Sequence, residues 1–123
     1  MSDLSEIEIL QKAQELIRDP EHWTQGAYAR TAKDREVGFL EQPACKFCSI
    51  GAVAKVIGDK SYDDYGNSDL WLRVSRAASW LDVAAQEAAF SIAKKLNDNG
   101  THEDVMAMFD RAIVAARVEQ ERA

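Results

Sequence analysis

The positions of glycine and proline constrain this chain more than any other feature, because they leave long stretches without a helix breaker. The breakers are Pro20, Gly26, Gly38, Pro43, Gly51, Gly58, Gly66 and Gly100. Within the uninterrupted stretches, apolar residues recur at steps of three and four, which places their side chains on one face of an α-helix. The sequence therefore predicts a mainly α-helical fold.

The two ends of the chain give clear helix signals. A first helix over residues 4–17 should end before Pro20, because the residue preceding a proline is pushed out of helical geometry. The last helix should run over residues 101–121, with Thr101 as N-cap and Asp104 three residues later. Its apolar face consists of Val105, Met108, Phe109, Ala112, Ile113 and Ala116.

A further helix is expected over residues 44–57, although Gly51 lies in its middle. Glycine at such a position costs about 1 kcal/mol relative to alanine and calls for a reason. Close approach of another backbone or of the Trp23 ring is the usual reason, and a ligand contact is the alternative. We favour packing.

Residues 68–96 form either one helix or two, because no glycine or proline lies between residues 67 and 99. Ser79 followed by Asp82 resembles a second capping signal, which favours a break near Trp80. A second helical face then runs from Ala85 to Leu96 and stops at residues 97–100. If the ring of Trp71 or Trp80 lies outside the apolar face, it marks a surface for a partner.

Together these segments predict a compact bundle of about five helices in a single domain, residues 1–123, with residues 117–123 as a tail that frays. The residue pattern of residues 26–40 differs from that of the predicted helices and is compatible with a short β-hairpin, although no Asn-Gly or Asp-Gly pair marks its turn.

Charge and hydropathy limit the classes of partner. Fifteen Lys and Arg against 21 Asp and Glu give a formal net charge of −6, which argues against direct nucleic-acid binding by bulk attraction. The N-terminus lacks the pattern of a signal peptide, and no apolar stretch is long enough to span a membrane. We therefore expect a cytoplasmic protein with reduced thiols.

Cys45 and Cys48 form the most distinctive local motif, because two thiols three residues apart at a helix start can share a disulfide or a metal. A redox site of this kind would follow a strand, which the preceding residues do not suggest. Metal binding would need two more ligands, and His22 and His102 are the only histidines. We favour a buried, structural Cys48 and expect no cofactor and no metal site.

The segment over residues 59–69 is the best candidate for a recognition surface. It combines carboxylates with tyrosines, namely Tyr62, Asp63, Asp64 and Tyr65, and could bind a basic partner. A plain solvated turn is the competing interpretation. The chain contains none of the common nucleophile, phosphate-binding or zinc-protease motifs.

Three short motifs resemble a family of small bacterial and phage proteins of unknown function. They are Trp-Thr-Gln-Gly-Ala at residues 23–27, Phe-Cys-Ser-Ile-Gly-Ala at residues 47–52, and the pair Asn97-Asp98 before the last helix. The resemblance spans residues 4–116 and implies no activity. Cys45 has no counterpart in the pattern, and Phe47 stands where tryptophan is usual. Arg30, Asn97 and Asp98 are the polar positions to inspect in any pocket.

From these observations we expect a noncatalytic protein-binding module with a protein partner of unknown identity. The resemblance adds the expectation of a phage protein that acts on a host protein. The alternative is a small zinc- or thiol-dependent protein that uses Cys45 and Cys48. A homodimer also stays open, because the last helix is long and alanine-rich helices pair easily.

Overall fold

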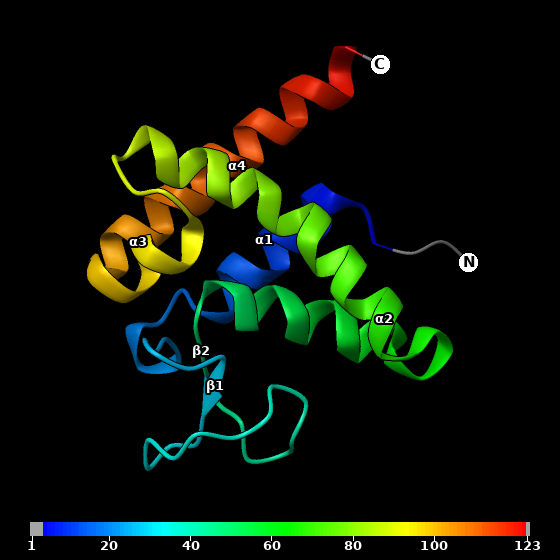
Figure 1. Ribbon diagram of the computed structural model, residues 1–123, viewed down its shortest axis with the longest axis vertical. Coiled ribbons are helices and arrows are strands. Elements are labelled where there is room, and N and C mark those ends of the chain that lie inside the picture. The colour runs from blue at the N-terminus through cyan, green and yellow to red at the C-terminus, as the bar shows by residue number, and fades with distance from the viewer. Residues whose placement is uncertain (1–3, 123) are drawn as a thin grey trace.

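The computed structural model describes residues 4–122, including the side chains of residues 4–59 and 69–122. This part of the chain forms four α-helices, one short 3-10 helix and a two-stranded antiparallel sheet (Figure 1), which confirms the predicted fold class. The elements are α1 (Glu6–Leu16), η1 (Pro20–His22), β1 (Ala29–Arg30), β2 (Lys46–Phe47), α2 (Ser49–Glu87), α3 (Ala93–Asn99) and α4 (His102–Arg122).

The first and last helices begin at reciprocal caps. The Ser5 hydroxyl accepts from the backbone N–H of Glu8 at 3.1 Å, and the Glu8 carboxylate accepts from the N–H of Ser5 at 2.9 Å. Thr101 and Asp104 form the same pair of bonds ahead of α4, at 2.9 and 3.1 Å. Each cap satisfies donors that a helix start leaves free. The two predicted helices are therefore confirmed, and α4 includes the residues up to Arg122.

The helix α2 differs most from the prediction. It begins at Ser49 instead of residue 44, because Lys46 and Phe47 are extended and pair with β1. The break expected near Trp80 is wrong, since the helix continues through it to Glu87. The expected turn over residues 59–69 falls within the bounds of α2. The parts of this helix before and after it, residues 49–59 and 69–87, run in different directions (Figure 1).

The helix predicted over residues 85–96 is interrupted at Ala89. This residue has a φ of 71°, which lies in the left-handed region that glycine usually occupies. The N–H of Ala89 donates to the carbonyl of Gln86 at 3.0 Å, and the N–H of Phe90 donates to the carbonyl of Ala85 at 2.9 Å. These two bonds are those of a Schellman motif, which ends α2 with alanine in the glycine position.

Asp82 is a capping residue, but for a different helix from the expected one. Its carboxylate accepts from the backbone N–H of Ala93 at 2.8 Å, at the first residue of α3. Ser79 instead donates its hydroxyl to the carbonyl of Arg76 at 2.7 Å, within α2. The capping signal in the sequence was therefore real, but it starts α3 and does not divide α2.

The small sheet joins segments on either side of a long loop. Ala29 pairs with Phe47 and Arg30 pairs with Lys46 in antiparallel register. Within residues 26–40, the expected hairpin is reduced to an isolated antiparallel bridge between Arg30 and Glu36. The chain reverses there because the hydroxyl of Thr31 accepts backbone N–H groups that follow it. The strand partner of β1 thus comes from farther along the chain.

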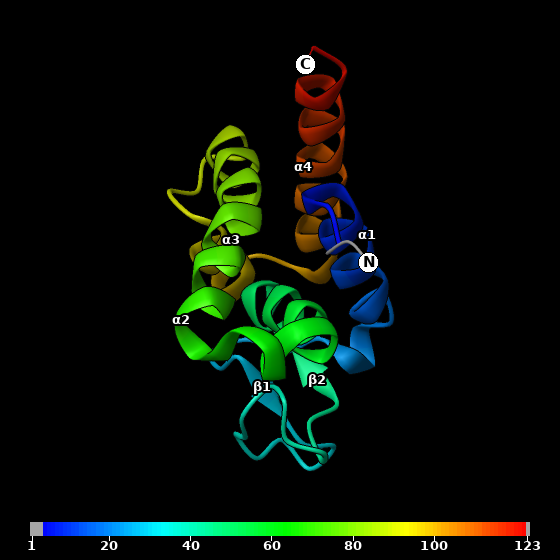
Figure 2. The ribbon, with the colours of Figure 1, turned by 90° about the vertical axis from the view of Figure 1, so that its right-hand side faces the viewer.

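The core lies between the helices, where α2 packs against α1, α3 and α4, and α1 packs against α4. Figure 2 shows α1 beside α4, with the two strands and their loops at one end of the molecule. The largest fully buried side chains include Leu10, Ile17, Leu81, Leu96 and Phe109. Among the described helices, none combines the length and the hydropathy that crossing a lipid bilayer requires.

Candidate functional site

The three sequence motifs meet around the side chain of Asn97, which is 1% exposed. Its amide oxygen accepts from the indole Nε1 of Trp23 at 2.8 Å. The same oxygen accepts from Ser49, from the backbone N–H at 2.9 Å and from the hydroxyl at 2.7 Å. A residue of α3 thus satisfies the first free N–H of α2, although the two residues are 48 positions apart.

The amide nitrogen of Asn97 completes the arrangement. It donates to the backbone carbonyl of Thr24 at 3.1 Å and to the Asp98 carboxylate at 3.2 Å. Every polar atom of this buried amide therefore has a partner, as burial requires. Because the side chain is fully used, Asn97 joins the segment after η1 to α2 and α3 and is not free for a ligand.

Gln25 and Asp98 strengthen the same junction from the outside. The Gln25 amide nitrogen lies 3.0, 3.3 and 3.1 Å from the carbonyl oxygens of Asn97, Asp98 and Gly100, which end α3. The Asp98 carboxylate accepts from the N–H of Gly26 at 2.9 Å. We call the junction formed by Trp23, Thr24, Gln25, Gly26, Ser49, Asn97 and Asp98 the asparagine junction.

Gly51 lies where another backbone crosses α2. A Cβ atom at this position would lie 1.9 Å from the carbonyl oxygen of Tyr28, closer than any real contact allows. That carbonyl also accepts from the N–H of Cys48 at 3.2 Å. Packing is therefore confirmed as the reason for this glycine, and the neighbour is the backbone of Tyr28 and not the Trp23 ring.

Cys48 caps α2 and is buried. Its sulfur accepts from the N–H of Gly51 at 3.2 Å, and burial raises the pKa of the thiol above its ordinary value. A raised pKa keeps the thiol protonated at neutral pH and removes the nucleophilic form. Cys45 is half-buried, and both cysteines are free. This environment fits a structural Cys48.

The histidines do not join these thiols in a metal site. His102 places Nε2 2.8 Å from the carbonyl oxygen of Ile17, and its ring contacts that of Trp23 with centroids 5.5 Å apart. His22 lies in η1. Within the described part of the chain, no group of three or more His, Cys, Asp and Glu side chains is placed to hold a metal ion.

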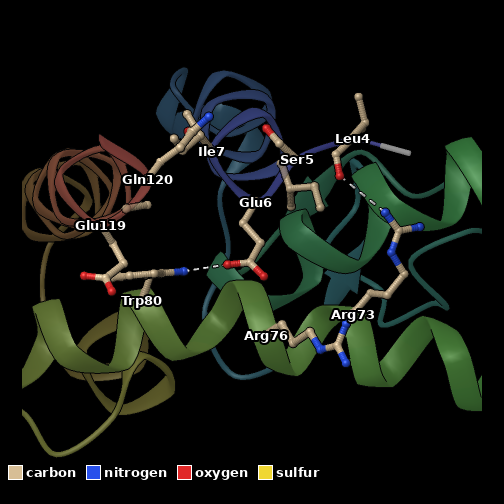
Figure 3. Close-up of a pocket in the computed structure, with 11 residues that line it drawn as sticks. Leu4, Ser5, Glu6, Ile7, Arg73, Arg76, Trp80, Glu119 and Gln120 are labelled. Carbon is tan, nitrogen blue, oxygen red and sulfur yellow. Dashed lines mark hydrogen bonds between the residues drawn. The ribbon is translucent and has the colours of Figure 1, made fainter. Parts of the chain in front are cut away.

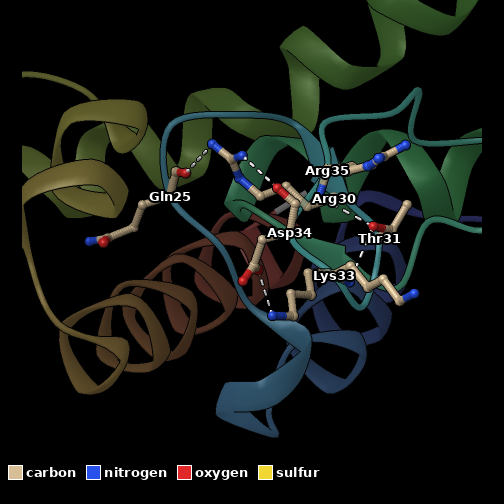
Figure 4. A network of polar contacts seen from close by, with 7 residues as sticks. Gln25, Arg30, Thr31, Lys33, Asp34 and Arg35 are labelled. Atoms are coloured by element: carbon tan, nitrogen blue, oxygen red, sulfur yellow. Dashed lines mark hydrogen bonds and ion pairs between the residues drawn. The ribbon is translucent and has the colours of Figure 1, made fainter.

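Arg30 also has a structural position. Its guanidinium donates to the carbonyl of Asp34 at 3.1 Å and to that of Gln25 at 3.4 Å (Figure 4). Lys46 forms a 2.6 Å ion pair with the Asp34 carboxylate, and this hydrogen bond and charge lower the pKa of Asp34. The network fixes the turn after β1 against β2.

A small hollow of about 180 Å³ lies beside the asparagine junction. Two of its lining groups are the protonated thiol of Cys48 and the Asp98 carboxylate, which is already hydrogen-bonded to a backbone N–H. The raised pKa of the Cys48 thiol removes its nucleophilic form in this hollow. The lining residues are Gly26, Ala27, Tyr28, Glu36, Cys48, Lys94 and Asp98.

The predicted recognition residues Tyr62, Asp63, Asp64 and Tyr65 fall outside the side chains that the structure describes. The hypothesis of a recognition surface there stays a prediction. The structure brings Asn97 and Asp98 together in one junction and places Arg30 in the neighbouring network.

A larger groove of about 550 Å³ lies between the start of α1, the second part of α2 and the end of α4 (Figure 3). The half-buried Trp80 lines it and donates from Nε1 to the Glu6 carboxylate at 2.8 Å. Arg73 and Arg76 come from the same helix, and Arg73 donates to the carbonyl of Leu4 at 3.5 Å. We call this the α1–α2–α4 groove. The sequence pointed to Trp80, whereas the two arginines carried no signal.

The fold and the junction define a class of small, mainly helical domain in which a buried asparagine connects three distant segments. A family model described as a family of unknown function (DUF6197) matches residues 1–115, and the chain belongs to this family. The residues from Ala116 onward lie beyond the matched range. Neither curated proteins nor solved structures gave a match to the chain.

Proposed function

We propose that this protein is a noncatalytic module that binds another protein through the α1–α2–α4 groove. The observation that carries the proposal is the composition of the groove, where the side chains of Trp80, Arg73 and Arg76 line a largely apolar hollow together with the carboxylates of Glu6 and Glu119. Tryptophan and arginine are the residues that most often dominate binding energy at protein interfaces. The cytoplasm as compartment follows the sequence interpretation, and a host protein as partner follows the resemblance to phage proteins.

Two arginines and two glutamates line the groove, and Arg76 is the group that indicates the chemistry of its occupant. Arg76 is exposed, and among the described residues no carboxylate lies within ion-pair distance of its guanidinium. In a chain with a net charge of −6, such a cation is a local feature against the overall charge. We therefore propose an acidic side chain of the partner as the group that Arg76 binds.

The shape of the groove supports a helical segment as the occupant. Its walls come from three helices, and apolar side chains line it alongside Trp80, including Leu4, Ile7, Ile9 and Ala116. An amphipathic helix binds such a groove by inserting apolar residues spaced three and four apart. The proposed partner segment is thus an amphipathic helix with an acidic residue beside its apolar face.

Site-specific photo-crosslinking in the producing cell tests the proposal. A photoreactive residue replaces Gln120, which lines the groove, and in a matched control it replaces Val83, which is 52% exposed and does not line it. We expect a discrete protein adduct at Gln120 alone. The variant Arg76→Glu should weaken this adduct about tenfold, the change that about 1.4 kcal/mol produces.

The variant Lys95→Glu serves as the charge control, because it changes the net charge equally at an exposed position of α3. It should leave the adduct unchanged. Identical adducts from Gln120 and Val83, or an adduct that Arg76→Glu does not weaken, would overturn the proposal.

A further inference from the structure

The outer face of α4 exposes two valines that its own fold does not cover. Val114 is 59% exposed and Val118 is 46% exposed, and they lie one helical turn apart. With about 100° per residue, both lie on the side of the helix opposite Ala116, which is buried. The last turns of α4 project beyond the other elements in both Figure 1 and Figure 2, so this side is accessible.

Two charged residues extend this apolar pair symmetrically. Arg111 precedes Val114 by three residues, and Glu121 follows Val118 by three, so that the steps are three, four and three. Such spacing keeps all four side chains on one helix face. We call Arg111, Val114, Val118 and Glu121 the outer stripe of α4.

The outer stripe is complementary to itself when it is reversed. If two copies of α4 pair in antiparallel orientation about the level of residue 116, each Arg111 lies opposite Glu121 of the other copy. Each Val114 then lies opposite Val118, at the centre of the contact. This is the order of an antiparallel helix pair with an apolar centre and ion pairs at both ends.

The charged ends of the stripe are available for such pairs. Arg111 and Glu121 are exposed, and neither forms a salt bridge or a side-chain hydrogen bond with any other residue that the structure describes. Ala115 flanks the stripe and is small enough to let two helix axes approach. The α1–α2–α4 groove uses the other side of α4, at Ala116, Glu119 and Gln120, so the two surfaces do not compete.

We propose that the outer stripe of α4 is a surface for self-association, which binds the same stripe of a second copy in antiparallel orientation. One helix face is small compared with specific interfaces, which bury about 1,200–2,000 Å² in total. The dimer is therefore in reversible exchange with the monomer. This inference is independent of the function proposed for the groove.

Sedimentation equilibrium of the purified full chain, from about 10 µM to about 1 mM, measures the dimerisation that a small interface allows. We expect a concentration-dependent dimer for the wild-type chain. The double variant Val114→Ser/Val118→Ser should weaken it at least about tenfold, because it removes the apolar centre. Val83→Ser changes a valine of similar exposure on α2 and should leave dimerisation unchanged.

Charge exchange tests the antiparallel order. Arg111→Glu alone and Glu121→Arg alone each place like charges opposite one another twice, so both should weaken the homodimer about tenfold or more. The double variant R111E/E121R restores both pairs and should dimerise within about threefold of the wild type. A parallel pair would place like charges opposite each other in the wild type and in every variant, so the single substitutions would not weaken it. Lys95→Glu controls for net charge.

Circular dichroism establishes that each variant folds, which we expect because every substituted side chain is exposed. A wild-type chain that is monomeric over the whole range overturns the proposal. So does a dimer that the valine substitutions do not weaken, or one that the double charge exchange fails to restore.

Discussion

Replacing Asn97 by alanine should destabilise the fold more than any other polar substitution in the described part of the chain. The change removes the acceptor of both Ser49 donors and of the Trp23 indole, together with the two bonds that the amide nitrogen donates. Because Ser49 is 0% exposed, its N–H and hydroxyl lose their partner away from solvent.

The expected magnitude follows from these donors. Each buried polar group left without a partner costs about 1–3 kcal/mol, and two such groups at Ser49 give roughly 2–6 kcal/mol. Rotation of the hydroxyl relieves part of this cost, so we expect Asn97→Ala to lower the free energy of unfolding by about 3–4 kcal/mol. A typical domain has only about 5–15 kcal/mol in total.

Urea unfolding followed by circular dichroism measures the effect. Ser49→Ala removes one donor and leaves the other bonds of the amide, so it should cost about 1 kcal/mol. Asn99→Ala, at an exposed asparagine two residues farther along α3, is the matched control and should cost at most about 0.5 kcal/mol. Our reasoning is refuted if Asn97→Ala costs less than about 1 kcal/mol or no more than Asn99→Ala.

The variant Asn97→Asp separates hydrogen bonding from charge. It keeps an acceptor oxygen but buries a carboxylate beside Asp98, so the pKa of the new carboxyl should be raised in the folded state. A raised pKa favours the fold below the ordinary value of about 3.9 and penalises it as the pH rises. The stability gap to the wild type should therefore be larger at pH 7 than near pH 4.

Three further predictions follow from single contacts. Gly51→Ala should cost several kcal/mol, measured by urea unfolding, because its Cβ would overlap the carbonyl of Tyr28; a cost below about 1 kcal/mol would contradict this contact. Ala89→Gly should raise the unfolding free energy by about 0.5–1 kcal/mol, because Ala89 has φ of 71°, and a loss of stability would refute the role assigned to this turn. Alkylation of the native protein at pH 8 should modify Cys45 well before Cys48, whose pKa is raised by burial, and equal rates for the two thiols would contradict this. The free energy of unfolding should also fall as the pH rises past the ordinary pKa of a thiol, because the Cys48 thiol ionises there only in the unfolded chain.

The sequence predicted the elements whose signals are local. The caps at Thr101 and the apolar periodicity after it place α4 correctly, because both operate within one or two turns. Gly51 was correctly attributed to packing, with a backbone or the Trp23 ring as the neighbour, because glycine weakens a helix interior and therefore calls for a close neighbour that leaves no room for a side chain. In each case the residue type alone indicates the structural role, a helix cap at Thr101 and a close contact at Gly51.

The boundary between α2 and α3 could not be read from the sequence, because an unusual residue occupies it. The left-handed position that ends α2 belongs to Ala89, and alanine is otherwise the best helix former. Asp82 carried a genuine capping signal, but its target, Ala93, is eleven residues away across the turn. The helix propensity of this segment favours a continuous helix, but tertiary contacts end α2 at Glu87.

The motifs that form the asparagine junction could be seen in the sequence, but their contacts could not. The motifs drew attention to Arg30, Asn97 and Asp98, yet capping accounted for the last two equally well in the sequence. The partners of Asn97 lie far away along the chain, because Trp23 is 74 residues and Ser49 is 48 residues from it. Only the packing of α3 against the start of α2 brings the motifs together.

The asparagine junction has a consequence for where binding specificity resides. Its buried polar groups are satisfied by one another, and Cys48 is held as a protonated cap, so these motif residues maintain the fold and leave few groups for a partner. The function that we propose accordingly places recognition on a surface residue outside the motifs, Arg76 in the groove. Val118 and Glu121 also lie beyond residues 1–115, the range that the family model matches. Two of the four residues of the proposed outer stripe therefore lie outside the part of the chain on which family membership rests.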